Sequence, residues 1–136
     1  MDLNTLVDLA RGALRNGPPL RIAAVFGSAA RGSSHAGSDV DLAIWPRDEE
    51  LSLEAELDLQ VKLERAIGRQ VDLVRLDRAS TLVRWEVARQ GALVLAEPPW
   101  EWTRFVARAA SDYGDFQPAL AEAVRRLHRR LTQGAT

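Results

Sequence analysis

The segment from Val25 to Ile44 reads V-F-G-S-A-A-R-G-S-S-H-A-G-S-D-V-D-L-A-I, and our interpretation of the chain starts from it. It runs from an apolar strand through a Gly-Ser turn and a glycine- and serine-rich loop to a second strand headed by Asp39 and Asp41. Because side chains alternate between the two faces of a strand, both carboxylates are predicted to lie on one face, about 7 Å apart along the backbone. Val40 and Leu42 are predicted to point to the opposite face.

This arrangement suits the binding of a divalent cation and a phosphate. Two carboxylates on one face repel each other unless a positive charge lies between them, and Mg²⁺ is commonly held by one or two carboxylates, with oxygen ligands at about 2.1 Å. Gly27 and Ser28 directly follow the first strand and are predicted to begin a short helix that continues to Arg31. Their backbone N–H groups, the Ser28 hydroxyl and the Arg31 guanidinium would then face an anion.

The spacing of these residues resembles a known signature. Gly27-Ser28, ten further residues and then Asp39-x-Asp41 match the pattern G-S-x10-D-x-D of the DNA polymerase β-like nucleotidyltransferase superfamily. The longer string G-S-A-A-R-G…S-D-V-D-L is similar to the minimal nucleotidyltransferases (MNT proteins), which are encoded beside HEPN-domain partners in toxin–antitoxin pairs. The resemblance is strong from Leu20 to Ile44 and looser over the rest of the chain. A β-hairpin with a polar loop and a capping aspartate is the alternative interpretation.

Asp72 is the best candidate for a third carboxylate beside Asp39 and Asp41 at the predicted metal site. It lies within an apolar run, V-D-L-V, where an aspartate costs free energy unless it is paired or bound to a metal. The resemblance implies that a third acid on a neighbouring strand joins the first two, ligates metal and accepts the proton of the attacking hydroxyl. The alternative for Asp72 is a pair with Arg69 or Arg75. Asp77 is a competing candidate, but we expect it to cap the helix that follows.

The resemblance implies an enzyme that depends on Mg²⁺ and transfers AMP from ATP to a hydroxyl. The implied acceptor is a tyrosine of a cognate HEPN toxin, an RNase, so the chain would be a protein adenylyltransferase and an antitoxin. Two alternatives stay open: nucleotidyl transfer to a small molecule or an RNA end, and a non-catalytic antitoxin that neutralises its partner by binding. The implied site consists of Asp39, Asp41 and Asp72, as catalytic groups and ligands of two Mg²⁺ ions, and of Gly27, Ser28, Arg31 and Ser38, which bind ATP.

The expected fold is α/β (α+β), with a polymerase β-like nucleotidyltransferase core in which a short mixed sheet is packed with helices. We expect a single domain over residues 1–136, with a helical C-terminal segment from about 98 to 134. Apolar periodicity and turn residues predict the boundaries of the other elements. These are helices over Asp2–Arg15, Ser52–Ile67 and Thr81–Gln90, and strands over Leu20–Phe26, Ser38–Trp45, Gln70–Leu76 and Ala92–Ala96.

The C-terminal segment from Trp100 to Leu131 is predicted to be helical and to be broken into two pieces near Asp112–Phe116 and Pro118. Its last piece is predicted to be a basic amphipathic helix, which can be a solvated surface or can lie on an acidic partner or a membrane. The resemblance favours a protein partner for this region. In the last piece, Leu120, Val124, Leu127 and Leu131 share one face, and Arg125, Arg126, Arg129 and Arg130 share the other.

The amino-acid composition and the net charge argue against several classes of function. A formal net charge of −1 and a pI near 6.1 argue against a general nucleic-acid binder, so direct nucleic-acid binding is not expected. The chain has no cysteine, which excludes disulfides and thiolate metal sites. Neither a signal peptide nor an apolar run of membrane-spanning length is visible, so we expect a cytoplasmic protein without membrane contact. His35 and His128 are isolated in the sequence, and we assign neither a catalytic role.

Overall fold

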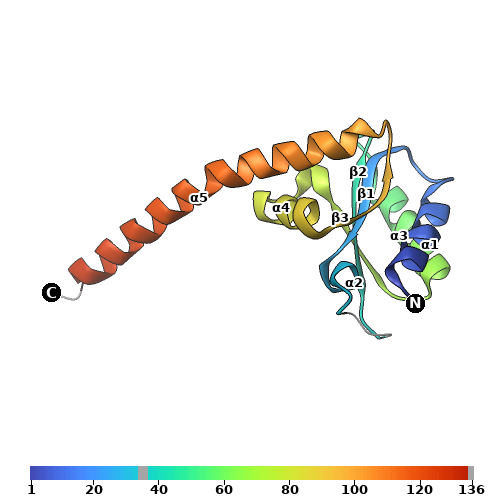
Figure 1. The fold of residues 1–136 in the computed structure, drawn as a ribbon, viewed down its shortest axis with the longest axis horizontal. Coiled ribbons are helices and arrows are strands. Elements are labelled where there is room, and N and C mark those ends of the chain that lie inside the picture. Colours follow the sequence, from blue (N-terminus) through green and yellow to red (C-terminus); the bar gives the residue numbers. More distant parts are fainter. Residues whose placement is uncertain (34–36, 135–136) are drawn as a thin grey trace.

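The computed structural model describes residues 1–33 and 37–134, and it contains a four-stranded sheet with helices on both faces (Figure 1). The strand order is β3-β2-β1-β4. β1 is antiparallel to both β2 and β4, whereas β2 and β3 are parallel, so the sheet is mixed. The predicted α/β fold with a short mixed sheet is therefore confirmed. The strands are β1 (Leu20–Phe26), β2 (Val40–Pro46), β3 (Val71–Arg75) and β4 (Ala92–Ala96).

One face of the sheet packs against α1 (Leu3–Leu14) and α3 (Leu53–Ile67). Both helices begin at a residue whose side chain accepts a backbone N–H of the first turn: Asp2 for α1 and Ser52 for α3. α3 ends at Gly68, which has a φ of 77° and donates its N–H to the helix. These helices bury the apolar residues of the central strands, including Val40, Leu42 and Ile44, as alternation predicts.

The other face packs against α4 (Thr81–Gln90) and the first half of α5 (Trp100–Gly134). Phe105 and Ala109 of α5 and Val87 of α4 are buried there with residues of β1 and β2. A one-turn helix, η1 (Leu76–Arg78), leads from β3 toward α4, and a short helix, α2 (Gly27–Arg31), follows β1. α2 contacts β1, β2 and α4, and its Ala29 is buried with the core on the α1 and α3 side, so α2 lies at the end of these two strands.

α5 is one continuous helix of 35 residues, about 52 Å long, so the predicted break near Pro118 is wrong. Proline removes one helical hydrogen bond, but the residues after it are mostly strong helix formers such as alanine, leucine and arginine. The helix therefore continues through Pro118. Figure 1 shows its second half running away from the sheet and the other helices.

The predicted boundaries of β1, α4 and β4 are confirmed, and those of α1, β2, α3 and β3 differ by one or two residues at one or both ends. β2 begins at Val40 rather than Ser38, and it includes Pro46 instead of ending before it. His35 and part of the loop before β2 lie outside the described residues. Within the described parts of the chain, no helix combines the length and the apolar character that a membrane crossing requires.

Candidate active site

Gly27 is the residue at which β1 turns into α2, and it lies against the side chain of Asp41. Its φ angle is 67°, in the left-handed region where residues with a side chain are strained. A methyl group at this position would collide with the Asp41 carboxylate. Ser28 is half-buried, and its carbonyl accepts the backbone N–H of Ser33 at 3.0 Å. The turn therefore keeps the backbone of Gly27 and Ser28 next to an acidic side chain.

The three aspartates lie at one end of β2 and β3. Asp39 immediately precedes β2, Asp41 is its second residue, and Asp72 is the second residue of β3. Asp41 and Asp72 are register partners in the parallel pair, so their side chains project to the same face of the sheet. The intervening Val40 and the preceding Val71 are buried against α1 and α3. The acids therefore face the other side, toward α4.

Negative charge is concentrated around Asp41. Burial raises the pKa of this carboxyl above its ordinary value, and the nearby negative charges of Asp72, Glu86 and Asp39 raise the pKa further. Arg31 opposes this shift, but less strongly than each of the other contributions. A half-buried carboxylate surrounded by like charges favours the approach of a cation, because the cation relieves both the repulsion and the lost hydration.

Glu86 belongs to this cluster although the sequence analysis did not single it out. It comes from α4 and pairs with Arg31, with 3.5 Å between Arg31 Nη1 and Glu86 Oε1. Gln90, one turn later on α4, accepts a hydrogen bond from the same nitrogen at 3.5 Å. In the sequence, Glu86 is an ordinary polar residue of an amphipathic helix. No motif marks it, and only the packing of α4 over α2 reveals its position.

The backbone before β2 is held by Arg69. Its Nε and Nη2 donate hydrogen bonds to the Ser38 carbonyl at 3.0 and 2.7 Å. Ser38 is half-buried and adjoins Asp39, so these bonds position the peptide that leads into the first aspartate. Ser38 thus lies at the same end of the sheet as Gly27 and Ser28.

Asp72 is exposed, so the prediction that it costs free energy in an apolar run is wrong. β3 is an edge strand, and its face on the α4 side is less covered than the face against α3. Nor does Asp72 pair with Arg75. The Arg75 guanidinium instead donates to Asp77, with Nη2 and Oδ2 2.6 Å apart, and to the carbonyls of Leu51 and Glu49.

Asp77 has a structural role rather than the predicted capping role. Ser80 caps α4, and its hydroxyl accepts the backbone N–H of Val83. The Asp77 side chain is 6% exposed and that of its partner Arg75 is 5% exposed, so the two form a buried ion pair. Hydrogen bonding to Asp77 raises the pKa of Arg75. Because Asp77 is engaged by Arg75, Asp72 stays the candidate for the third acid.

The donor chemistry of the acidic end fits a divalent cation, although the protein alone does not enclose one. Within residues 1–33 and 37–134, no three histidine or acidic side chains stand close enough to surround a metal ion. Mg²⁺ does not require such a cage, because it usually takes one or two carboxylates and completes its shell with water and phosphate oxygens. Asp41, with Asp39 and Asp72 on the same face, would supply carboxylate oxygens to such an ion.

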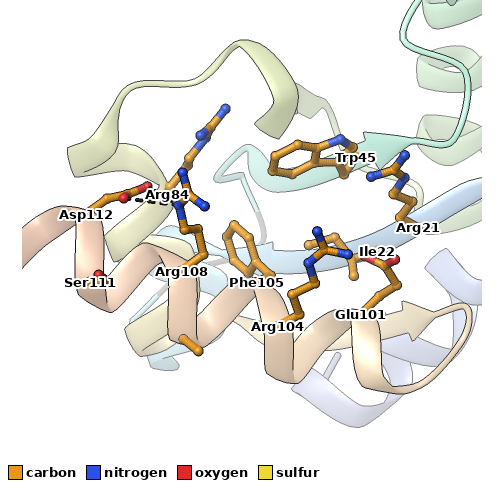
Figure 2. Close-up of a pocket in the computed structure, with 11 residues that line it drawn as sticks. Arg21, Ile22, Trp45, Arg84, Glu101, Arg104, Phe105, Arg108, Ser111 and Asp112 are labelled. Carbon is orange, nitrogen blue, oxygen red and sulfur yellow. Dashed lines mark hydrogen bonds and ion pairs between the residues drawn. The ribbon is translucent and has the colours of Figure 1, made fainter.

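A cavity of about 540 Å³ lies at the opposite end of β1 and β2 (Figure 2). Arg21, Trp45, Arg84 and Phe105 are among the residues that line it, and the Arg84 guanidinium lies 4.9 Å from the centre of the Trp45 ring. None of the three aspartates borders this cavity. It is therefore separate from the acidic end of the sheet.

Comparison with protein families assigns residues 11–99 to a family described as polymerase beta, nucleotidyltransferase. The chain belongs to this nucleotidyltransferase family. The matched segment contains the Gly27-Ser28 turn and all three aspartates, and the sheet has the polymerase β-like topology that the sequence resemblance implied. Both the family and the fold predicted from the sequence are confirmed.

Individual relatives carry more specific descriptions. Protein adenylyltransferase MntA of Shewanella oneidensis is 38% identical over 88 residues, which make up 65% of this chain but only 60% of MntA. A chain from a crystal structure of a toxin-antitoxin with AMP-PNP is 29% identical, with a TM-score of 0.74, and the match covers 93% of this chain and 98% of that one. A chain from a tri-AMPylated Shewanella oneidensis HEPN toxin in complex with an MNT antitoxin is 26% identical, with a TM-score of 0.66 and coverages of 92% and 94%.

Proposed function

We propose that this protein transfers AMP from ATP to a tyrosine hydroxyl of a cognate HEPN-domain toxin, and that it acts as the antitoxin of that toxin. The observation that carries the proposal is the placement of Asp41, which lies against the Gly27-Ser28 turn and faces Asp72 across the parallel strands. The descriptions of the relatives support the choice of AMP and of a HEPN toxin as acceptor.

The Gly27-Ser28 turn is the proposed binding site for the triphosphate of ATP. Gly27 has no side chain, so a phosphate can approach the backbone while the Asp41 carboxylate stays in place. The Ser28 hydroxyl and the backbone N–H groups of the turn act as donors, and Ser38 contributes from the other side of the site. Mg²⁺, when bound by Asp39, Asp41 and Asp72, would neutralise the charge on the phosphates and on the reacting oxygens.

The transfer forms one bond and breaks another at the α-phosphorus. The tyrosine oxygen bonds to this phosphorus while the bond to the oxygen that bridges the α- and β-phosphates breaks, so pyrophosphate leaves. Asp72 accepts the phenolic proton. Its exposure on an edge strand suits this role, because an acceptor on another protein must reach it from solvent.

Arg31 has a proposed role that depends on its present partners. Its guanidinium is 45% exposed and its contacts with Glu86 and Gln90 are both 3.5 Å, at the long end for such interactions. A triphosphate would offer stronger and more numerous acceptors. We expect Arg31 to exchange these contacts for phosphate oxygens when ATP binds.

Transfer of labelled AMP tests the proposal. The purified protein is incubated with labelled ATP, Mg²⁺ and the HEPN-domain protein encoded beside it, and label on the partner is measured. Asp41→Asn should reduce labelling by a factor of about 100 or more, since it removes charge at the centre of the site. Asp58→Asn, an exposed acid on α3, is the matched control and should leave labelling unchanged.

Three results would contradict the proposal. Undiminished labelling by Asp41→Asn would show that the transfer does not need the Asp41 carboxylate. Label on a small molecule or an RNA end, with none on the protein partner, would assign a different acceptor. Full neutralisation of the toxin by an Asp39→Asn/Asp41→Asn variant would indicate that binding alone is sufficient.

A further inference from the structure

One apolar stripe runs along the whole of α5, but the protein covers only its first half. In the covered half, Phe105 and Ala109 are buried against the sheet and α4, and Trp102 packs beside them. Tyr113 ends this half, with its ring stacked on Trp85 of α4 at a centroid distance of 5.1 Å. The same stripe continues at intervals of three, four or seven residues through Phe116, Leu120, Leu127 and Leu131.

Phe116 is half-buried, and beyond it the stripe is exposed. Leu120, Leu127 and Leu131 are 48%, 53% and 67% exposed. Figure 1 shows that this part of α5 has no neighbouring element. Where it leaves α4, a groove of about 410 Å³ is formed mainly by apolar side chains, among them Leu82, Phe116 and Leu120. The groove joins the bare stripe to the body of the protein.

The spacing of the stripe indicates that its partner is a helix. Apolar positions three and four residues apart form the seam along which two helices pack side by side. In the sequence, Val124 completes this pattern between Leu120 and Leu127.

The charges of the bare half favour an acidic partner over a second copy of this chain. Residues 113–134 contain four arginines but only two acids, a net charge of +2 in a chain whose overall charge is −1. Three of the arginines pair with Glu122. Arg130, at the edge of the stripe, pairs with no acid in the described parts of the chain. Two such surfaces repel each other, whereas a helix flanked by aspartate or glutamate would neutralise them.

The bare half of α5 is only partly stabilised by its own residues, because its helix formers follow two residues that weaken a helix. Gly114 and Pro118 both disfavour a helix, and the hydrogen bond from Gln117 to Tyr113 and the ion pairs of Glu122 are local and exposed. Most helices in proteins are stabilised by packing an apolar face against another element. In Figure 1 no element of this chain packs against this half of α5, so a partner molecule would supply the missing packing.

We propose that residues 113–131 of α5 are the docking surface for an amphipathic helix with acidic flanks on the partner protein. This inference rests on the proposed function, because it takes the partner to be the HEPN-domain protein that receives AMP. Docking on α5 would hold that protein while its tyrosine reacts at the far side of α4, so affinity for the partner and catalysis depend on different residues.

A pair of matched double variants tests the surface. Leu127→Glu/Leu131→Glu places charge on the stripe, and Leu53→Glu/Leu57→Glu does the same on α3, where the two leucines are 69% and 50% exposed. Affinity for the purified HEPN-domain partner is measured by calorimetry without ATP. The α5 variant should bind at least about tenfold more weakly, and the α3 variant should bind as the unmodified protein does. Thermal unfolding should show that both variants remain folded.

The outcomes separate this inference from the proposed function. Equal affinity of the α5 variant and the unmodified protein would overturn the docking surface, even if the partner is labelled normally. Weaker binding by the α5 variant, together with no AMP transfer by any form of the protein, would support the surface and contradict the proposed function. If the chain alone is a dimer that Leu127→Glu/Leu131→Glu converts to a monomer, the occupant is a second copy and the proposal is wrong.

Discussion

Asp41 and Asp72 are partners across two parallel strands, and the negative charge of Asp72 contributes to the raised pKa of Asp41. We predict that Asp41→Asn raises the thermal midpoint at pH 7 by about 1–3 °C, because it removes a charge that burial and its neighbours disfavour. In an Asp72→Asn background the gain should be smaller, since one source of repulsion is already absent. A double-mutant cycle followed by calorimetry measures the coupling, and strictly additive effects would contradict it.

The same carboxyl gives a pH dependence whose sign follows from its raised pKa. Between the ordinary value of 3.8 and the raised value, the native state binds more protons than the unfolded state, so the contribution of Asp41 to stability falls as pH rises through this window. The gain from Asp41→Asn should therefore be complete above the window and should vanish below pH 3.8. Urea unfolding of both forms over this pH range provides the test, and a gain that grew on acidification would refute it.

Gly27→Ala should destabilise the protein more than Gly32→Ala. Both glycines have positive φ angles, 67° and 73°, so each substitution carries backbone strain of about 1 kcal/mol. Only at Gly27 does the new methyl group meet the Asp41 carboxylate, whereas nothing lies within 4 Å at Gly32. Urea unfolding gives the difference in free energy. AMP transfer should be lost with Gly27→Ala and retained with Gly32→Ala; similar losses in both variants would argue against the contact.

Asp77→Asn should reduce the free energy of unfolding by about 3 kcal/mol, because it leaves the buried Arg75 charge without its carboxylate. Asp112→Asn breaks an exposed pair with Arg108 and should cost less than about 1 kcal/mol. Chemical denaturation compares the two variants. AMP transfer per folded molecule should be normal in Asp77→Asn at low temperature, and a specific loss of transfer would return Asp77 to the candidate site.

Glu86→Gln should lower the pKa of Asp41, because it removes one of the negative charges that raise this value. The substitution keeps a side chain of the same size and an acceptor for Arg31. The ¹³C signal of the Asp41 carboxyl, followed by NMR during titration of the metal-free protein, reports the shift directly. An unchanged titration would show that Glu86 lies too far away, or is too well screened, to act on Asp41.

Local sequence was sufficient to predict the elements that carry the proposed site. Gly27 and Ser28 begin a helix directly after β1, and the alternation around Val40 assigns Asp39 and Asp41 to one face. These features depend on residues close together in the chain, where turn preference and strand periodicity are strong signals.

Features that depend on tertiary contacts were missed or mistaken. Glu86 reaches the acids only because α4 packs over α2, and Asp77 is buried only because Arg75 turns back toward Leu51. Strand order exposes Asp72, since it leaves β3 at the edge. The predicted break at Pro118 was wrong because helix formers follow this proline, and the helix continues through it.

β3 carries Asp72 on one face and the buried Val71 and the partly buried Leu73 on the other. A shift of this strand by one position would turn Asp72 toward the apolar core and would expose Val71 and Leu73 to solvent. Misaligned molecules would therefore be unstable, and Asp72 would no longer lie beside Asp41. The packing that selects the native register of β3 thus also fixes the distance between these two acids.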